Sequence, residues 1–138
     1  MKFIAIFTSL ALLPAAFGDT VSYDPVYDNS GNSLDIVACS NGANGLLTAG
    51  YTTFGSLPSF PYIGGAAAVS GWNSPNCGTC WNLTYTNSQG VATSISVLAI
   101  DYTLTGFNIA LEAMNKLTGG QAVQLGRVNI AATEVAKS

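Results

Sequence analysis

Residues 71–81 of this chain, GWNSPNCGTCW, hold both tryptophans and two of the three cysteines of the sequence. Asn, Ser, Pro and Gly cluster in the first part of the stretch, which is typical of a loop. From Trp81 onward, apolar and polar residues alternate, which predicts a half-buried strand. We therefore expect a rigid loop that runs into a core strand, with the rest of the domain as its scaffold.

The cysteine count allows one disulfide and leaves one thiol over. The possible pairs are Cys39–Cys77, Cys39–Cys80 and Cys77–Cys80. A bridge from Cys39 would close a long loop and stabilise the fold by about 4 kcal/mol in the chain-entropy model. A Cys-x-x-Cys bridge closes almost nothing and is mostly a redox device. We therefore favour a structural bridge from Cys39.

The N-terminus has the pattern of a secretory signal peptide. Lys2 precedes an apolar run at residues 4–13, and small residues follow at Ala16 and Gly18. A membrane anchor is the alternative, but the run is too short to cross about 30 Å of hydrocarbon. We predict a signal peptide at residues 1–18, one mature domain at residues 19–138, and a secreted, extracellular protein without membrane insertion.

The composition argues against several functional classes. The chain has no histidine, which removes the usual general base, metal ligand and nucleophile partner. Four basic residues stand against seven acidic ones, so nucleic acid is not an expected partner. Because only 8% of residues are charged, Ser, Thr, Asn and Gly must cover the surface. Such a surface suits a neutral polar partner such as a polysaccharide, and we expect no metal or cofactor.

Short alternating segments dominate the chain after the signal. We expect strands at residues 21–24, 34–38, 81–85, 91–100 and 127–135, and either a tight strand or a close backbone approach at residues 64–70. Residues 26–27 are a candidate extension of the first strand past Pro25, which would make it an edge strand. Helical spacing predicts a helix at residues 107–117 that stops at the glycine pair 119–120, and one helical turn is expected at residues 54–57. This pattern is typical of a small closed β-barrel.

Motifs along the whole mature chain resemble the cerato-platanin family of small secreted fungal proteins. The matching stretches are VSYD at 21–24, CSNG at 39–42, GL at 45–46, FPYIGG at 60–65, GWNSPNCGTCW at 71–81, Asp101 and GFN at 106–108. The CGTCW core inside GW-x-SP is the most specific part. The resemblance implies a mainly β fold, a six-stranded double-ψ β-barrel with one short α-helix and minor helical turns, similar to the first domain of expansins.

The resemblance also selects among the cysteine pairs. The family has two bridges, the first of which is equivalent to Cys39–Cys77. The second joins the equivalent of Cys80 to a cysteine at the extreme C-terminus, and this sequence ends at Ser138 without one. We therefore expect a Cys39–Cys77 bridge and a Cys80 thiol outside it. That thiol is expected to be buried, with pairing between chains as the alternative.

Asp101 is the first candidate for a functional side chain, because it ends the most apolar strand. Its carboxylate would face a groove or cap a turn, and the resemblance to expansins favours contact with polysaccharide in a groove. Loops supply candidates for stacking on sugar rings and for hydrogen bonds to sugar hydroxyls, with turn formation and core packing as their alternatives. The predicted groove residues are Asp101, Asn41, Gly45, Tyr62, Trp72 and Asn108. Asn82 begins the one glycosylation sequon, Asn82-Leu83-Thr84.

We expect no catalysis. Glycoside hydrolysis needs two carboxylates. A partner for Asp101 among the other acids is not excluded by spacing, but the resemblance argues against one. These acids are Asp24, Asp28, Asp35, Glu112 and Glu134.

The resemblance implies a protein that binds N-acetylglucosamine oligomers or related cell-wall polysaccharide, loosens it and associates with the fungal wall. It also implies an elicitor or phytotoxic effector that acts through a plant surface receptor. Self-association as a surface-active film is the alternative.

Overall fold

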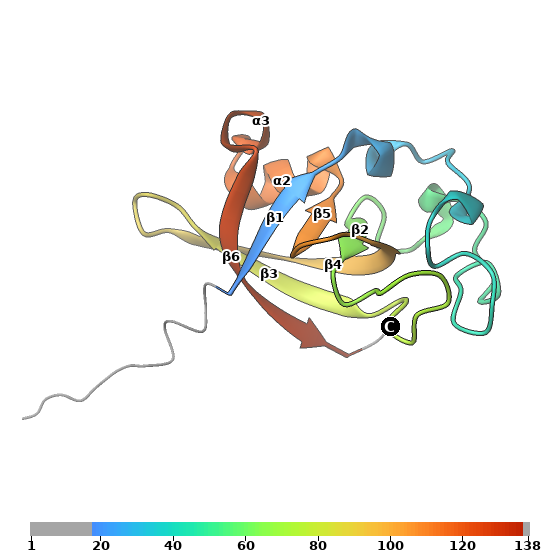
Figure 1. The fold of residues 1–138 in the computed structure, drawn as a ribbon. Coiled ribbons are helices and arrows are strands. Elements are labelled where there is room, and N and C mark those ends of the chain that lie inside the picture. The colour runs from blue at the N-terminus through green and yellow to red at the C-terminus, as the bar shows by residue number, and fades with distance from the viewer. Residues whose placement is uncertain (1–17, 137–138) are drawn as a thin grey trace, which may run out of the picture.

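The computed structural model describes residues 18–136. Six strands close into a barrel in the order β1-β5-β2-β4-β3-β6 (Figure 1). They are β1 (Asp19–Tyr23), β2 (Ile63–Ala66), β3 (Cys80–Thr86), β4 (Ala92–Tyr102), β5 (Phe107–Ile109) and β6 (Arg127–Val135). The predicted mainly β, closed six-stranded barrel is confirmed, and the double-ψ crossing stays a prediction. The expected signal peptide lies, up to residue 17, outside the described residues.

Within residues 18–136, the barrel is accompanied by two helices and three single turns of 3-10 helix. Helices α2 (Leu111–Thr118) and α3 (Ala122–Leu125) lie together at one end of the barrel (Figure 1). The turns η2 (Pro25–Asp28), η3 (Leu34–Ile36) and η4 (Phe54–Ser56) belong to the long connection from β1 to β2. In Figure 1 most of this connection gathers on the side opposite the tip of the β3–β4 hairpin.

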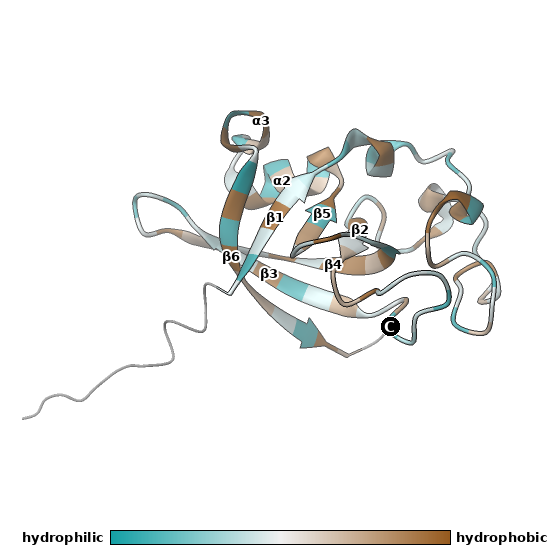
Figure 2. Ribbon diagram, in the orientation of Figure 1, coloured by the Kyte–Doolittle hydropathy of each residue, from teal (hydrophilic) through white to brown (hydrophobic). Residues whose placement is uncertain are grey.

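The core fills the barrel and continues beneath α2. Strand alternation supplies much of it, as β6 illustrates, where Val128 and Ile130 are buried while Arg127 and Asn129 are exposed. Figure 2 shows this alternation as hydrophobic and hydrophilic bands along β6. Side chains at alternate positions of a strand point to opposite faces, so the same strand packs the core and presents a polar surface. The largest fully buried side chains include Phe54, Leu34, Ile63, Leu83, Ile100, Ile109, Met114, Leu117 and Ile130.

The helix predicted at residues 107–117 is wrong in its first part. Phe107–Ile109 form β5, which pairs in parallel with β1 and antiparallel with β2, and the helix begins at Leu111. Ladder bonds on both sides outweigh the weak helical preference of three residues. Gly119, with φ 66°, ends α2 as expected. The helix α3 was not predicted.

Asp28 caps the N-terminus of α2 from a distant part of the chain. Ala110, at the N-cap position, makes no side-chain cap bond. The carboxylate of Asp28 accepts instead from the backbone N–H groups of Leu111 (2.7 Å) and Glu112 (2.9 Å). Because a carboxylate at a helix N-terminus also interacts favourably with the helix dipole, this tertiary cap holds α2 against η2.

Two further strand predictions are wrong for one shared reason. Residues 34–38 contain the turn η3 in place of a strand. Residues 26–27 lie in η2, directly after Pro25. The side chain of Ser33 accepts from Asp35 N–H, and that of Asp24 accepts from Val26 N–H. Such local bonds compete with strand pairing. The strand predicted at residues 64–70 ends at Ala66, and the helical turn predicted near residue 54 is confirmed as η4.

The predicted bridge between Cys39 and Cys77 is confirmed, and both residues are buried. It spans 38 residues and joins the β1–β2 connection to the loop at residues 67–79. Cys80 lies outside this bridge, half-buried at the start of β3, opposite Leu98 and Val135.

Gly106 shows how closely the turn before β5 approaches β1. Its φ is 59°, and a Cβ atom added to it would overlap the carbonyl oxygen of Thr20. Gly119 also has a positive φ, but a Cβ atom there meets nothing within 4 Å. Comparing substitutions at the two glycines therefore separates the effect of backbone strain from the effect of steric overlap.

We predict that Gly106→Ala lowers the free energy of unfolding by clearly more than Gly119→Ala does. The control should cost about 1–2 kcal/mol, the usual strain of a left-handed L-residue. Urea denaturation followed by circular dichroism measures both values. Equal losses would show that Gly106 is needed for its dihedral angle alone.

Candidate functional site

Four strand pairings line up five residues across the barrel wall. Asp101 pairs with Gly65, Gly65 with Asn108, Asn108 with Ser22, and Ser22 with Arg127. We call these five residues the cross-strand row. With about 4.8 Å between neighbouring strands, the row is about 19 Å long. Residues on either side of it, such as Val21, Phe107 and Ile109, are buried, so its side chains face outward.

A β-bulge turns Asp101 into this row. The register between β2 and β4 shifts between Gly64 and Gly65, so the pairing passes from Ala99 directly to Asp101. The skipped residue, Ile100, is fully buried. Bulges re-aim side chains in this way and are frequent beside functional sites. Here the bulge lets three consecutive apolar residues, Leu98 to Ile100, stay buried while the next side chain reaches the outer face.

The other end of the row is a chain of hydrogen bonds. Arg127 donates from Nη2 to Ser22 Oγ (2.9 Å) and from Nη1 to Thr20 Oγ1 (2.7 Å). Ser22 Oγ donates in turn to Asn108 Oδ1 (2.8 Å). This bond uses the amide oxygen of Asn108. The Nδ2 group of Asn108 donates no hydrogen bond to another residue within the range 18–136. The row therefore offers an oriented amide donor to a ligand.

The carboxylate of Asp101 is held by donors from three stretches of chain. Oδ1 accepts from the backbone N–H groups of Ala38 (3.0 Å) and Tyr102 (2.9 Å), and Oδ2 accepts from the hydroxyl of Tyr27 (2.8 Å). An ionised carboxylate has about four acceptor positions. The remaining one lies on Oδ2, where a half-buried Asp101 can accept one further bond from a ligand hydroxyl.

Tyr27 is the buried partner of this carboxylate. It is only 5% exposed, and its ring stacks against that of Phe54 at 6.1 Å between centroids. Burial, and after it the charge and hydrogen bond of Asp101, raise the pKa of Tyr27 above its usual value. The phenol therefore stays protonated and remains a donor, which keeps Asp101 in place.

A second group of predicted residues meets on the loops. Trp72 is 63% exposed and donates from Nε1 to Asn41 Oδ1 (2.6 Å). Asn73, with φ 60°, accepts from the backbone of Asn44 through Oδ1 (2.9 Å) and from Asn44 Nδ2 through its carbonyl (3.1 Å). We call these four residues, Asn41, Asn44, Trp72 and Asn73, the loop platform. It presents a fixed, exposed aromatic face.

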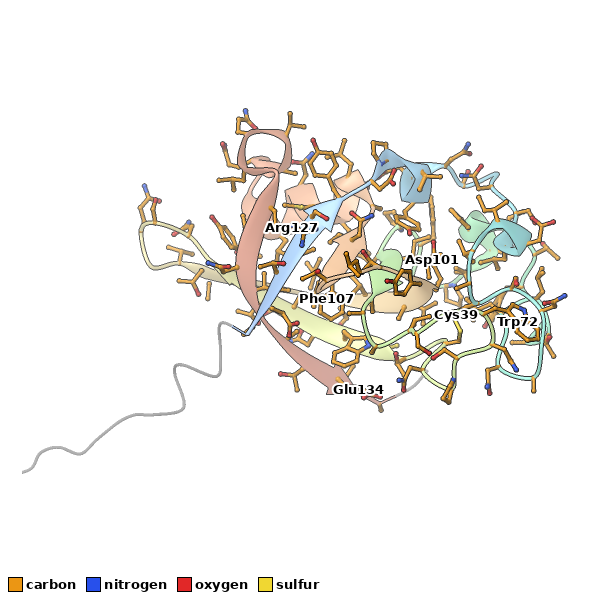
Figure 3. The ribbon with its side chains drawn as sticks, in the orientation of Figure 1. Cys39, Trp72, Asp101, Phe107, Arg127 and Glu134 are labelled. Atoms are coloured by element: carbon orange, nitrogen blue, oxygen red, sulfur yellow. A yellow bond between two sulfur atoms is a disulfide. The ribbon has the colours of Figure 1, made fainter. Side chains whose placement is uncertain are left out.

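The structure thus divides the six predicted groove residues. Asp101 and Asn108 belong to the cross-strand row, whereas Asn41 and Trp72 belong to the loop platform, and Figure 3 shows Trp72 at the loop edge away from Asp101. Gly45 has a structural role, because a Cβ atom there would overlap the carbonyl oxygen of Ser40. Tyr62 is half-buried and packs against the core.

Arg127, Ser22 and Tyr27 belong to the candidate site by their contacts and were not predicted from the sequence. Ser22 lies in the VSYD motif and Arg127 opens a correctly predicted strand, so the sequence marked their positions as outward and polar. It did not give the register that brings them to Asn108. Asn82 is half-buried on β3, opposite Ser96 and Thr133.

Asp24 acts by its charge on the same Tyr27 phenol as Asp101, and it and two other acidic residues have roles or positions of their own. Both oxygens of Asp28 are used by α2, and Oδ1 of Asp24 caps η2. Glu134 lies near the far end of β6, away from Asp101 in Figure 3. Within residues 18–136, no three His, Cys, Asp or Glu side chains gather into a group that could hold a metal ion. The helices of this part of the chain are all too short or too polar to cross a membrane.

We predict that Tyr27→Phe lowers the free energy of unfolding by about 1.5–3 kcal/mol at pH 7, the range for a hydrogen bond to a charged group. The wild-type protein should also lose stability above pH 10, because the unfolded state then releases a tyrosine proton that Tyr27 keeps in the folded state. Tyr27→Phe should flatten this decline. Urea denaturation at pH 7 to 11 measures it, and Tyr102→Phe, at an exposed ring, is the control that should leave the decline unchanged.

Comparisons with known proteins place the chain in a family. The model of the cerato-platanin family matches residues 19–138. Allergen Asp f 15 of Aspergillus fumigatus is 56% identical over 109 residues, which cover 79% of this chain and 68% of the relative.

Solved structures agree with this match. The crystal structure of cerato-platanin 1 from M. perniciosa has a TM-score of 0.83 at 46% identity and covers 86% of this chain and 95% of its own. The solution structure of the fungal elicitor Cerato-Platanin has a TM-score of 0.73 at 42% identity, over 85% and 92% of the two chains. The resemblance found in the sequence is confirmed, and the chain belongs to the cerato-platanin family.

Proposed function

We propose that this protein is a secreted, non-catalytic binder of cell-wall polysaccharide, with N-acetylglucosamine oligomers as its first candidate ligand. The observation that supports this best is the polar cross-strand row. It offers acceptor capacity on Asp101 and donors on Asn108 and Arg127 along about 19 Å of the outer barrel wall. A sugar chain with hydroxyl and acetamido groups can pair with both kinds of group. Binding that competes with bonds between polysaccharide chains would also loosen the wall.

The loop platform supplies a second contact in this proposal. The exposed ring of Trp72 gives a flat apolar face for a pyranose ring, and its bond to Asn41 fixes the orientation of that face. Aromatic side chains gain both contact area and a polar anchor in such sites. The platform and the row would bind different sugar units or different chains.

The placement of the acids supports a binding role over hydrolysis. A glycosidase needs a proton donor and a second carboxylate facing the same bond. Three donors hold Asp101, and Asp28 is committed to the cap of α2. Soluble sugar released from chitin or cellulose oligomers, and lost on Asp101→Asn, would contradict the non-catalytic proposal.

Action on plants is part of the same proposal and is supported by family membership. One solved relative is described as a fungal elicitor, and another relative as an allergen. We propose that this chain is likewise recognised outside the fungal cell, by a plant surface receptor.

A film-forming role is the second candidate, and exposed apolar side chains favour it. Leu104 is 81% exposed, Val123 62% and Ile36 58%. Exposed apolar groups drive association where they form one contiguous patch. Absence of saturable sugar binding, together with concentration-dependent association, would put this candidate first.

We predict saturable binding of N-acetylglucosamine oligomers that Asn108→Ala weakens about five- to tenfold, the effect of one lost hydrogen bond. Isothermal titration calorimetry measures it. Gln124→Ala removes an exposed amide on α3, away from the row, and should leave the affinity unchanged. Equal affinities for both variants would remove the row from the proposal.

We predict that the oligomers also shift the fluorescence of Trp72 to shorter wavelength, because stacking takes an exposed indole out of water. Trp81, the other tryptophan, packs edge-on against Phe107 and should not respond. Trp72→Phe should abolish the shift while retaining binding at the row. A shift that persists in this variant would contradict the assignment to the loop platform.

A further inference from the structure

A cavity of about 670 Å³ lies on the loop side of the barrel, apart from the cross-strand row. Its volume is within the range of about 300–1,000 Å³ that is usual for small-molecule sites. It shares no residue with the row. Its lining residues are Ala43, Asn44, Gly45, Leu46, Thr48, Ala49, Tyr51, Leu57, Pro58, Ser59, Cys77, Gly78, Cys80 and Leu98.

The walls of this cavity are held before any ligand binds. Cys77 is joined by its disulfide to Cys39, whose carbonyl accepts from Leu46 N–H (3.0 Å). Tyr51 N–H donates to the carbonyl of Leu46 (3.1 Å), which closes the loop. Asn44, at the exposed rim, is tied to Asn73 by two bonds. A preformed cavity avoids the entropy of ordering its walls on binding.

The chemistry of the lining points to a neutral occupant. None of the lining residues is Asp, Glu, Lys or Arg, and Leu46, Leu57 and Leu98 line the cavity together with Pro58 and the half-buried Tyr51. An ionised ligand would leave water without gaining a charged partner, which is unfavourable. The net negative charge of the chain further disfavours an anion.

Ser59 adds one polar requirement to this apolar site. Its Oγ atom is buried and is the only such side-chain atom within residues 18–136 that lacks a hydrogen-bond partner. A buried polar group without a partner is destabilising. Because serine rotates among three staggered χ1 positions and Ser59 is part of the lining, a ligand in the cavity can supply the missing partner.

We propose that this cavity binds a neutral, mostly apolar small molecule that carries one hydroxyl or carbonyl group. The apolar body of this ligand fills the cavity, and its polar group forms a hydrogen bond with Ser59. This site is separate from the cross-strand row, with which it shares no residue, whereas it borders the loop platform through Asn44.

The neutral fluorescent probe N-phenyl-1-naphthylamine tests the site directly. We expect saturable one-to-one binding to the full protein. Ala49→Trp, at the exposed rim, should fill the cavity and reduce probe affinity at least tenfold. Ala92→Trp, at an exposed position on the first residue of β4 and outside the lining, is the matched control and should bind as wild type does. Non-saturable binding, or equal affinity in both variants, would overturn the site.

Displacement of the probe tests the chemistry of the ligand. 1-Decanol should displace it, whereas decanoate at pH 8 should not at the same concentration. Ser59→Ala should weaken displacement by decanol about fivefold while leaving probe binding intact. Equal displacement by alcohol and carboxylate would overturn the neutral ligand class. Asp101→Asn and Asn108→Ala should bind the probe normally, so failure of the sugar site and failure of this site remain distinguishable.

Discussion

The Asp101 carboxylate is the interaction on which the arrangement of the loops depends. It accepts hydrogen bonds from the hydroxyl of Tyr27, 74 residues earlier, and from the backbone N–H of Ala38, 63 residues earlier. The β1–β2 connection has no long helix or strand of its own and crosses the barrel wall at this point. One charged group at the end of a buried strand therefore replaces the secondary structure that the connection lacks. The bulge beside Gly65 is what brings the carboxylate to the surface.

The predictions made from sequence were most accurate where a pattern was long. Strand β6 has the predicted bounds because its first part alternates between buried and exposed residues, whereas the three residues of β5 were absorbed into a helical pattern. Asp101 and Asn108 were predicted as candidates because one ends an apolar run and the other lies in a family motif. Their partners were not, since Tyr27, Ser22 and Arg127 reach them through tertiary pairing that no local pattern encodes.

The two halves of the molecule use opposite surface chemistry. The outer barrel wall from β4 through β2, β5 and β1 to β6 carries the polar groups of the cross-strand row, and strand register sets their spacing. The loop side holds a largely apolar cavity that is lined by Cys77 of the disulfide and by Gly45 and Gly78. The polar row and the apolar cavity can coexist because the polar groups lie on the outer face of the barrel. The long β1–β2 connection supplies the apolar contacts by which it packs against the barrel.

The pairing of β1 with β6 has a consequence for how the chain folds. Asp19 pairs with Ile130, and Ser22 with Arg127, so β1 cannot complete its pairing until β6 is present, more than 100 residues later. During synthesis, the barrel cannot close until β6 has left the ribosome. Contacts between such distant residues also make folding slow compared with that of a helical domain of similar size. The barrel therefore stays open until β6 pairs with both β1 and β3.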